Sequence, residues 1–414
     1  MRERERANQP QLRFKGFEGE WLDKTFGDIT KKVKEKNKLL KVETTLTNSA
    51  QFGIVKQTDF FDKDISNIEN IGNYYIVEPD TFALNMLMSN NAPAGSIRRN
   101  KTGITGIMSP LYYVFKIKNE DVTFTEVLFH SSKWHYYIFK NGNLGARLNR
   151  YSLSDEVLKL LPLKMPSIEE QKIIGFKISL IGEDIRIINT FDETLFSLKK
   201  TFLSHLFIDN KKEKALFRFK GFKDQYLTKT LNEITHTKIE KNKENLNLPQ
   251  LSSYANQGIV LKDIKSNSSK ITKETHSSYY ILERNDFVHN PNISVNKPVG
   301  HVSKNGVCDR GLISNIYHAF RPTDVNPDWL SFYFETDKWE NYVKVYSESG
   351  VRQARAAIIK SDIFQKMQIK LPSDEEQKMV AGFLLVLDKL IKLQKRKQEI
   401  MKDLKKTAMK MMLL

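Results

Sequence analysis

The residues best suited to chemistry form two copies of one short pattern. Glu170-Gln171-Lys172 and Glu376-Gln377-Lys378 each place a carboxylate two positions before an amine, the E-x-K arrangement of metal-dependent nucleases. Each glutamate also follows a serine, Ser167 or Ser373, by three positions, and S-x-x-E is the capping box that satisfies free amides at a helix start. A nuclease needs the pair on a strand beside an aspartate. We therefore expect these patterns to begin helices, and metal-dependent cleavage remains an alternative.

Other catalytic signatures are absent from the sequence. It has no G-x-x-x-x-G-K-[ST] phosphate loop, no H-E-x-x-H and no G-x-S-x-G. The Asn/Asp-Pro-Pro-aromatic site of amino-methyltransferases is missing too, because Asn290-Pro291-Asn292 lacks the second proline and the aromatic residue. Eight histidines and one cysteine, Cys308, form no cluster at metal-ligand spacing. We expect no catalytic centre, no bound metal and no bound cofactor in this chain.

Composition favours a basic protein with more than one domain. The chain has 414 residues and a formal net charge of +17. A single hydrophobic core seldom grows to this length, and a strong excess of lysine and arginine favours a polyanionic ligand such as nucleic acid. One cysteine favours a reducing compartment, and no apolar run is long enough to span a bilayer. We therefore expect a cytoplasmic protein.

The chain is an internal duplication. The segment Arg13 to Thr30 returns as Arg218 to Thr235, with 10 of 18 positions identical at an offset of 205. The offset persists through matched glycines, prolines and aromatic residues, and it becomes 206 near Pro166. A repeat of this length implies two copies of one structural unit.

Each copy contains a mixed region followed by a helix. Short runs rich in aromatic and β-branched residues predict strands at Tyr74 to Val77, Leu111 to Lys118 and Tyr279 to Leu282. Helical patches follow at Val127 to Phe139 and Trp329 to Val343. The fold class predicted is α/β, with two globular domains in tandem and two long helices.

The two long helices are predicted over Ser167 to Ile208 and Ser373 to Leu414, each 42 residues or about 63 Å. Apolar residues at alternating spacings of three and four indicate a coiled coil, and an antiparallel pair would hold the two domains apart. Asp184, Lys177 and Gln394 would be polar positions that fix the register. Packing of each helix on its own domain is the alternative. The seam residues predicted are Ile174, Ile181, Ile188, Leu195, Phe202, Val380, Leu387, Leu390, Met401 and Leu404.

These features divide the chain into six segments. They are a charged arm (1–12), a first globular domain (13–165), a central helix (166–208), a linker (209–217), a second globular domain (218–371) and a distal helix (372–414).

The arrangement resembles the specificity subunit of type I restriction-modification systems over nearly the whole chain. Members of that family alternate two target-recognition domains with two long helices. The helices begin with P-x-x-x-E-Q, as at Pro166 to Gln171 and Pro372 to Gln377, and a G-x-R turn closes each recognition domain, as at Gly145 to Arg147 and Gly350 to Arg352. The two recognition domains of such subunits are usually unrelated, whereas here they share a scaffold.

The resemblance implies a non-catalytic subunit that reads a two-part sequence in double-stranded DNA. It implies two methyltransferase subunits as partners, which use S-adenosylmethionine, and restriction subunits with motor and nuclease activity, which use ATP and Mg. Two readers on a rigid spacer would read two short words separated by unread base pairs, so helix length would set the gap.

Basic residues in loops bounded by Gly and Asn, or after a turn glycine, are the candidate DNA contacts. They are Arg98, Arg99, Lys101, Arg147 and Arg150 in the first half and Lys304, Arg310, Arg352 and Arg355 in the second. Arg98-Arg99 stand opposite Ser303-Lys304, which predicts two unlike half-sites. Solubility charge or internal ion pairs are the alternative roles of these residues.

Two further points remain open. Nine basic residues between Lys389 and Lys410 could face phosphates or an acidic partner, although such a run is more often a solvated helix face. A coiled-coil structural or adaptor protein with only non-specific DNA affinity is the alternative function.

Overall fold

The structure is a computed structural model that describes residues 9–60, 68–145, 149–208, 215–262, 273–294, 297–347 and 359–414. It consists of two compact units. Unit 1 contains residues 1–189 and 396–414, and unit 2 contains residues 190–395. Each unit therefore combines one globular region with a part of each long helix. No helix among the described residues is long and apolar enough to cross a membrane.

Each unit has a four-stranded antiparallel sheet with the same strand order. In unit 1 the order is β2 (Thr30–Lys32), β9 (Tyr113–Ile117), β6 (Phe82–Asn85) and β7 (Ser96–Arg99). In unit 2 it is β14 (Thr235–His236), β21 (His318–Pro322), β18 (Phe287–Asn290) and β19 (His301–Lys304). The internal repeat is thus a repeat of topology.

Smaller antiparallel strand pairs complete each unit. In unit 1 they are β1 (Leu22–Thr25) with β12 (Pro162–Met165), β3 (Leu46–Ser49) with β4 (Gly53–Lys56), β5 (Tyr75–Val77) with β8 (Gly106–Met108), and β10 (Asn143–Leu144) with β11 (Tyr151–Ser152). In unit 2 they are β13 (Leu227–Thr230) with β22 (Gln368–Leu371), β15 (Leu251–Tyr254) with β16 (Gly258–Leu261), and β17 (Tyr280–Glu283) with β20 (Arg310–Ile313). The strands expected near Tyr74, Leu111 and Tyr279 correspond to β5, β9 and β17.

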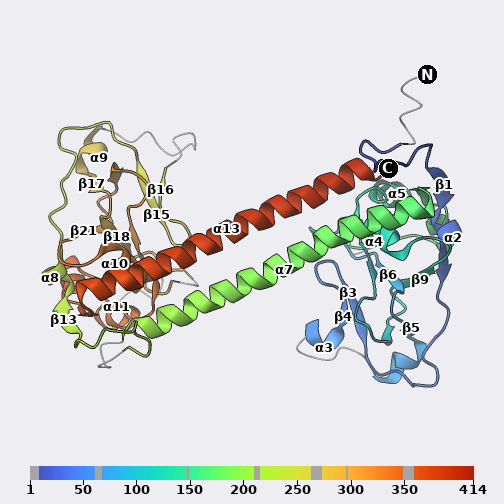
Figure 1. Cartoon of the computed structure of the whole chain (residues 1–414), viewed down its shortest axis with the longest axis horizontal. Helices are drawn as coiled ribbons and strands as arrows, with labels where there is room; N and C mark the ends of the chain where they lie inside the picture. Colours follow the sequence, from blue (N-terminus) through green and yellow to red (C-terminus); the bar gives the residue numbers. More distant parts are fainter. Residues whose placement is uncertain are drawn as a thin grey trace. The chain divides into compact units, whose positions relative to one another are not determined.

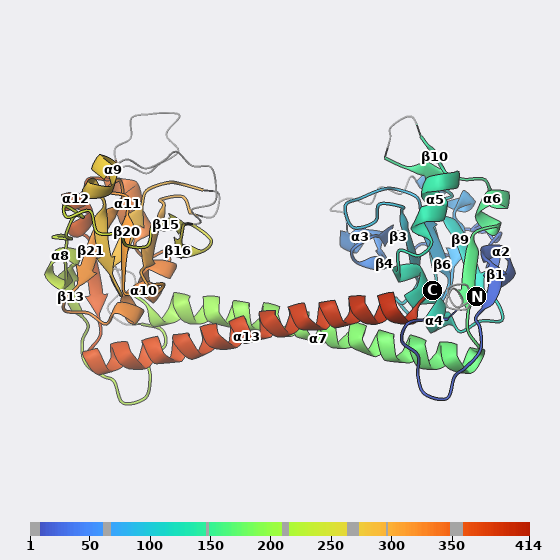
Figure 2. The same cartoon turned by 90° about the horizontal axis from the view of Figure 1, so that it is seen from above.

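Short helices cover the sheets, and several are labelled in Figure 1 and, from a second direction, in Figure 2. Unit 1 has α2 (Phe26–Ile29), α3 (Gln57–Phe60), η1 (Ile68–Asn73), α4 (Val122–His130), α5 (His135–Asn141) and α6 (Asp155–Lys159). Unit 2 has α8 (Leu231–Ile234), α9 (Lys273–Ser278), α10 (Pro327–Glu335), α11 (Glu340–Tyr346) and α12 (Ser361–Gln365).

The sequence predicted one helical patch after the sheet in each copy, but the structure has two helices there. The break follows from a buried tryptophan. The indole Nε1 of Trp134 donates to the Phe129 carbonyl at 3.0 Å, and Trp339 donates to Phe334 at 3.1 Å. This bond satisfies a carbonyl at the end of α4 or α10 and turns the chain before the next helix begins.

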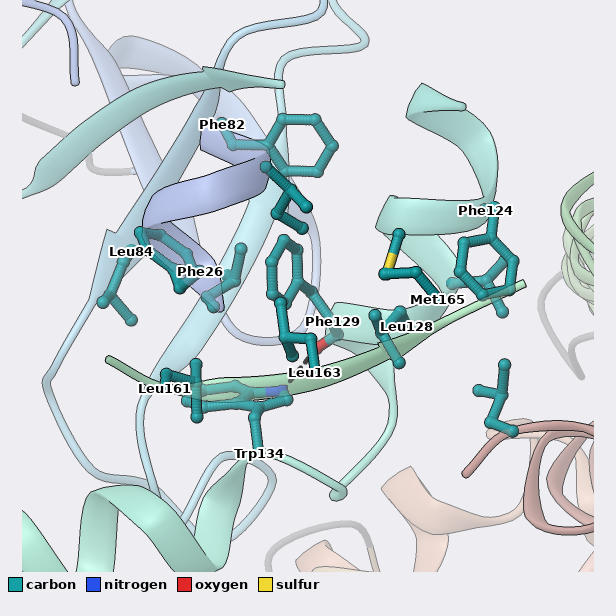
Figure 3. Close-up of a cluster of buried hydrophobic side chains, with 14 of the residues drawn as sticks. Phe26, Phe82, Leu84, Phe124, Leu128, Phe129, Trp134, Leu161, Leu163 and Met165 are labelled. Carbon is teal, nitrogen blue, oxygen red and sulfur yellow. Dashed lines mark hydrogen bonds between the residues drawn. The ribbon is translucent and has the colours of Figure 1, made fainter. Parts of the chain in front are cut away.

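The core of unit 1 is built around aromatic rings that lie between the sheet and α4 (Figure 3). Phe26, Phe82 and Phe129 are fully buried, and the rings of Phe26 and Phe129 lie 5.9 Å apart. Unit 2 repeats this arrangement with Phe287, Phe320 and Phe334. Aromatic burial of this extent supplies a large share of the stabilising free energy of each unit.

The two long helices are α7 (Ile168–Leu206) and α13 (Asp374–Met412), each 39 residues and about 58 Å long. Figure 1 shows α7 in green and α13 in red as uninterrupted helices. Their predicted bounds are confirmed within two residues at each end.

The helices pair antiparallel within each unit. In unit 1 a Cβ added to Gly182 would lie 2.8 Å from Lys405 Nζ. The side chain of Asn189 accepts a hydrogen bond from Gln398. From the first contact to the second, the position advances by seven residues in α7 and goes back by seven in α13. In unit 2 Lys199 pairs with Asp388 at 2.6 Å. Lys199 lies ten residues after Asn189 in α7, and Asp388 lies ten residues before Gln398 in α13. The same register therefore holds in both units, and packing of each helix only on its own domain is excluded.

Most predicted seam residues lie between the helices, with two corrections. Ile188, Leu195 and Leu387 are buried, and Ile181, Phe202 and Met401 are half-buried. Ile174 and Val380 are buried in the cores of units 1 and 2 rather than only between helices. Leu390 and Leu404 are instead 46% and 50% exposed. The residues on the seam are instead Ile391 and Lys405, each one position further along α13. Each lies four residues after a seam residue, Leu387 or Met401, as the alternating spacing of three and four allows.

The polar seam positions also differ from those predicted. Gln394 is half-buried as expected, but Asp184 and Lys177 are exposed. The polar residues between the helices are Asn189 and Gln398 in unit 1 and Lys199 and Asp388 in unit 2.

Candidate nucleic-acid interface

The glutamates of the E-x-K patterns hold a structural ion pair. Glu170 is fully buried and accepts two hydrogen bonds from Arg13, each 2.8 Å long. Glu376 accepts the equivalent pair from Arg218 at 2.9 and 2.6 Å. The side chain of Ser167 caps its helix by accepting from the Glu170 amide at 3.3 Å, but the glutamate turns to the arginine instead of completing a capping box.

The neighbouring glutamine explains the rest of this motif. Gln171 donates to the Pro166 carbonyl at 2.9 Å and accepts from the Asp121 amide at 2.9 Å, just before α4. Gln377 makes the matching bonds to Pro372 and Asn326. The motif thus joins the start of each long helix to its own unit. Among the described residues no three His, Cys, Asp or Glu side chains lie together so that they could hold a metal ion.

Three of the predicted DNA-binding residues are bound to protein groups. Arg98 donates to the carbonyls of Ile97 and Ala50 at 3.0 and 2.7 Å. Burial lowers the pKa of Arg98, although Glu126 opposes this shift. Arg99 pairs with Asp80 and Glu126 at 2.7 and 3.2 Å.

Lys304, the counterpart of Arg99, pairs with Asp328 of α10. These side chains fix strands β7 and β19 against α4 and α10, so internal ion pairing is their observed role.

The other predicted DNA-binding residues are more open. Lys101 is 62% exposed and lies 3.5 Å from Glu126, and Arg310 is exposed on β20. Arg150 is half-buried beside a hollow of unit 1. Arg147, Arg352 and Arg355 lie outside the described residues.

The hollow beside Arg150 has a volume of about 380 Å³ and combines rings with charge. Tyr75, Tyr112 and Tyr113 line it together with Lys32 and Asp155. Lys32 pairs with Asp155 and its Nζ lies 4.7 Å from the Tyr113 ring centroid. Desolvation, followed by Asp155 and Glu156, raises the pKa of Tyr113 to about 12, so its hydroxyl stays protonated. Rings that can stack, beside a guanidinium that can donate twice, are suited to an extruded or edge-exposed base.

A second hollow, of about 840 Å³, occupies a related position in unit 2. Thr237 and Ser361 line it where the repeat has Lys32 and Asp155 in unit 1, and His236, Lys238 and Lys366 add donors. The two hollows overlap only at these two matching positions of the repeat, and the rest of their lining comes from different positions. Two unlike half-sites stay a prediction that this difference favours.

One basic segment was missed in the sequence. The segment from β2 to β3 contains Lys31, Lys32, Lys34, Lys36, Lys38 and Lys41 with two acids, Glu35 and Glu43. Four of these lysines, Lys31, Lys34, Lys38 and Lys41, are exposed, and Lys36 lies 5.7 Å from the Tyr75 ring centroid. The matching stretch of unit 2 has fewer lysines, Lys238, Lys241 and Lys243, and two glutamates. A count of charge in each copy separately would have found it.

The tandem units with antiparallel sheets, joined to two long antiparallel helices, give this chain the fold of type I restriction-modification specificity subunits. The solved structure of the S subunit of a type I restriction-modification system from M. genitalium matches 98% of this chain and 99% of its own length, with a TM-score of 0.59 and 13% identity. The solved HsdS subunit from Thermoanaerobacter tengcongensis matches 94% of this chain and 95% of its own, with a TM-score of 0.42 and 14% identity.

Among curated proteins, the putative type I restriction enzyme MjaX specificity subunit of Methanocaldococcus jannaschii is 26% identical over 286 residues. The match covers 64% of this chain and 61% of that relative, which is less than two thirds of its length. No family model matches the chain.

Proposed function

We propose that this chain is the DNA sequence-specificity subunit of a type I restriction-modification complex and that it reads a bipartite, asymmetric target. The observation that carries the proposal is one repeated scaffold whose two copies contain differently lined hollows, which overlap at the Lys32/Thr237 and Asp155/Ser361 positions of the repeat. Two copies of one domain whose hollows are lined by different residues suit a DNA target with two different half-sites. The likeness to the S subunit of M. genitalium in fold and to MjaX in sequence supports the same assignment.

In this proposal Arg150 and the tyrosines of the unit 1 hollow contact bases, and the exposed lysines between β2 and β3 contact phosphates. Base contacts specify a sequence, while phosphate contacts hold the protein in position. Lys238 and Lys366 would serve the second word.

The helices would space the two readers and dock partners. Their outward faces carry large apolar side chains that are 44–65% exposed, which is unusual for a helix without a partner. They include Phe176, Leu180, Ile187, Phe191 and Phe196 on α7 and Leu385, Val386, Leu390, Leu393, Ile400 and Leu404 on α13. We assign this surface to two methyltransferase subunits, with restriction subunits joining the assembly.

The chain itself would be non-catalytic and would bind no cofactor. The two E-x-K patterns are the features most similar to a nuclease site, and their glutamates, Glu170 and Glu376, accept hydrogen bonds from Arg13 and Arg218. Methyl transfer would come from partner subunits with S-adenosylmethionine, and cleavage from restriction subunits with ATP and Mg.

The test is to map methylated adenines in DNA from cells that carry this chain and its methyltransferase subunit. We expect one two-part asymmetric motif. Arg150→Gln should relax one word by about tenfold and leave the other unchanged, because a bidentate base contact is worth about 1–3 kcal/mol. Lys366→Gln changes the hollow of unit 2 and should affect only the second word. Methylation without a motif, or an equal response of both words, would contradict the proposal.

Helix length gives a second readout. Removal of one heptad from both α7 and α13 shortens each by about 10 Å, which equals about three base pairs of B-DNA. The unread gap should shrink by about that amount, or binding should be abolished. An unchanged gap would contradict the spacer role.

A further inference from the structure

A basic cleft lies inside unit 1, away from the hollow beside Arg150. Its volume is about 800 Å³, and Ile185 of α7 and Met409 of α13 form its apolar lining. We call it the lysine cleft. Its charged and titratable residues are His130, Lys133, Lys402, Lys405, Lys406 and Lys410.

The elements of the fold converge there for a simple reason. Lys402, Lys406 and Lys410 recur every four residues and so lie along one side of α13. The end of α4 and the turn after it supply His130 and Lys133 on the facing wall. None of the five lysines forms an ion pair with any residue in the part of the chain that the structure describes.

Lys405 distinguishes this cleft from an ordinary solvated helix face. It is half-buried, and its Nζ lies against the backbone of Gly182, where an added Cβ would be 2.8 Å away. Burial lowers the pKa of Lys405, and Lys101 and Arg98 add to this shift while Glu126 opposes it. A half-buried cation without a partner costs free energy unless an anion joins it.

The repeat supplies an internal control. Lys199 is the counterpart of Lys405 in unit 2, and it pairs with Glu335 at 2.7 Å and Asp388 at 2.6 Å. Desolvation lowers its pKa, but these two carboxylates outweigh the effect and raise it overall. Unit 1 has His130 in place of Glu335 and Gly182 in place of Asp388. The same lysine therefore has two acidic partners in unit 2 and none in unit 1.

The surroundings of Lys405 in unit 1 are also more positively charged than those of Lys199 in unit 2. Lys402 and Lys410 in unit 1 correspond to Phe196 and Ser204 in unit 2. Five lysines line the cleft of unit 1, and Glu126 is the carboxylate whose charge acts on Lys405. The matching positions of unit 2 have three lysines and three carboxylates, those of Glu335, Asp337 and Asp388. The absence of both acids that pair with Lys199, together with two additional lysines, is an arrangement suited to an external anion.

We propose that the lysine cleft binds a phosphate oxyanion that takes the place of the two missing carboxylates. Lysine ammonium groups bind phosphate as point charges, and a concave, partly apolar wall strengthens the attraction by excluding water. The phosphate belongs either to a DNA backbone or to a free polyphosphate group. The first source rests on the proposed function, and the second does not.

Gly182→Asp tests the proposal because it installs in unit 1 the carboxylate that Asp388 provides in unit 2. Only the flexible end of Lys405 stands in the way of the new side chain. The full chain is titrated with sodium tripolyphosphate by calorimetry and with a duplex of random sequence between 50 and 200 mM salt. Lys402→Gln with Lys406→Gln is a second variant on exposed residues, and Lys200→Gln, the unit 2 counterpart of Lys406, is the control.

If a free phosphate is the ligand, both cleft variants should bind tripolyphosphate at least fivefold more weakly and bind the duplex as before. If DNA is the source, their duplex affinity should fall at least fivefold, with a salt slope smaller by about one for each phosphate that is no longer bound. Equal binding of both probes by the wild type and the cleft variants, or an equal weakening in Lys200→Gln, would overturn the site.

The preference for a target over random duplex is measured alongside. Because that preference belongs to the hollows, its absence would count against the proposed function while tripolyphosphate binding could still establish the cleft.

Discussion

The sheets of the two units share one strand order but differ in what fills their centre. Unit 1 has Leu84, Ser96 and Tyr113 where unit 2 has His289, His301 and His318. His289 is fully buried, lies 4.6 Å from the Phe364 ring in a stacked arrangement, and donates from Nε2 to the Val299 carbonyl at 3.3 Å. One scaffold thus accepts a leucine, a serine and a tyrosine or three histidines at the same positions, which teaches that the repeat preserves shape more than electrostatics.

Removal of the arginine from the ion pair at the start of each long helix should give the largest difference in stability between the two units. Arg13→Ala should destabilise unit 1 by about 3 kcal/mol because Glu170 stays buried without a counter-charge. Arg218→Ala should cost unit 2 about 2 kcal/mol, since Tyr226 still donates to Glu376 at 3.2 Å. Burial, followed by Glu376, raises the pKa of Tyr226 and keeps that donor protonated. Hydrogen exchange of α4 and α10 peptides measures each unit separately.

Trp21 replaces Tyr226 in unit 1, and its buried indole nitrogen has no hydrogen-bond partner among the residues that the structure describes. Tyr226→Phe should therefore make Arg218→Ala as costly as Arg13→Ala. If the two arginine variants are equally destabilising without that change, the tyrosine contributes nothing and the comparison fails.

Acid should give the next largest effect in unit 2, through His289. Desolvation, followed by His318, lowers the pKa of His289 from 6.5 to about 3 in the folded protein. The stabilisation is fully present above pH 6.5 and is lost as the pH falls toward 3, because only the unfolded chain takes up the proton. Between pH 7 and pH 5 this histidine alone should cost unit 2 about 2 kcal/mol. His301, with a pKa lowered to about 4 by burial and then by Lys297, acts in the same direction.

Exchange of β18 peptides at pH 7 and pH 5 measures this destabilisation in the wild type and in His289→Leu. His289→Leu introduces the residue of unit 1 and should remove about 2 kcal/mol of the pH dependence of unit 2. Burial, followed by Arg98, lowers the pKa of His130 in unit 1 to about 3, so unit 1 responds to acid as well. An unchanged pH dependence of unit 2 in His289→Leu would show that this histidine does not control it.

A loop conformation gives the smallest difference. Leu40 and Asn245 occupy matching positions with left-handed φ angles of 52° and 51°. Asparagine tolerates this region better than leucine. Leu40→Asn should stabilise unit 1 by about 0.5 kcal/mol, and Asn245→Leu should destabilise unit 2 by a similar amount. Thermal unfolding of the two variants measures both effects, and the same sign for both would be the contrary result.

The sequence predicted the long helices because the heptad pattern is a local property of each segment. It misplaced the seam at Leu390 and Leu404 because an apolar residue one position away satisfies the same spacing. What decides the register is the opposite helix, where Gly182 faces Lys405 and Asn189 accepts from Gln398. Those pairings join residues more than 200 positions apart, and no local pattern contains them.

The candidate site was less predictable for a related reason. Residue type marked Arg98 and Arg99 as ligands for phosphate or bases, but the carbonyl of Ala50 and the carboxylates of Asp80 and Glu126 already hold them. Whether an arginine is satisfied depends on partners brought close by folding. Arg150 remained open, but its tyrosine neighbours come from several separate strands and loops.

The core of unit 1 also sets the order in which the protein is completed during synthesis. Met412 and Leu413 pack beside Ile174 and Ile178, although they are translated more than 200 residues later. At about 5–20 residues per second a ribosome needs roughly 10 to 45 s to deliver them. The nascent first domain waits that long with an uncovered apolar patch, whereas unit 2, which is continuous from Thr190 to Lys395, can close as it emerges. Chaperone demand should therefore fall mainly on the half that is made first.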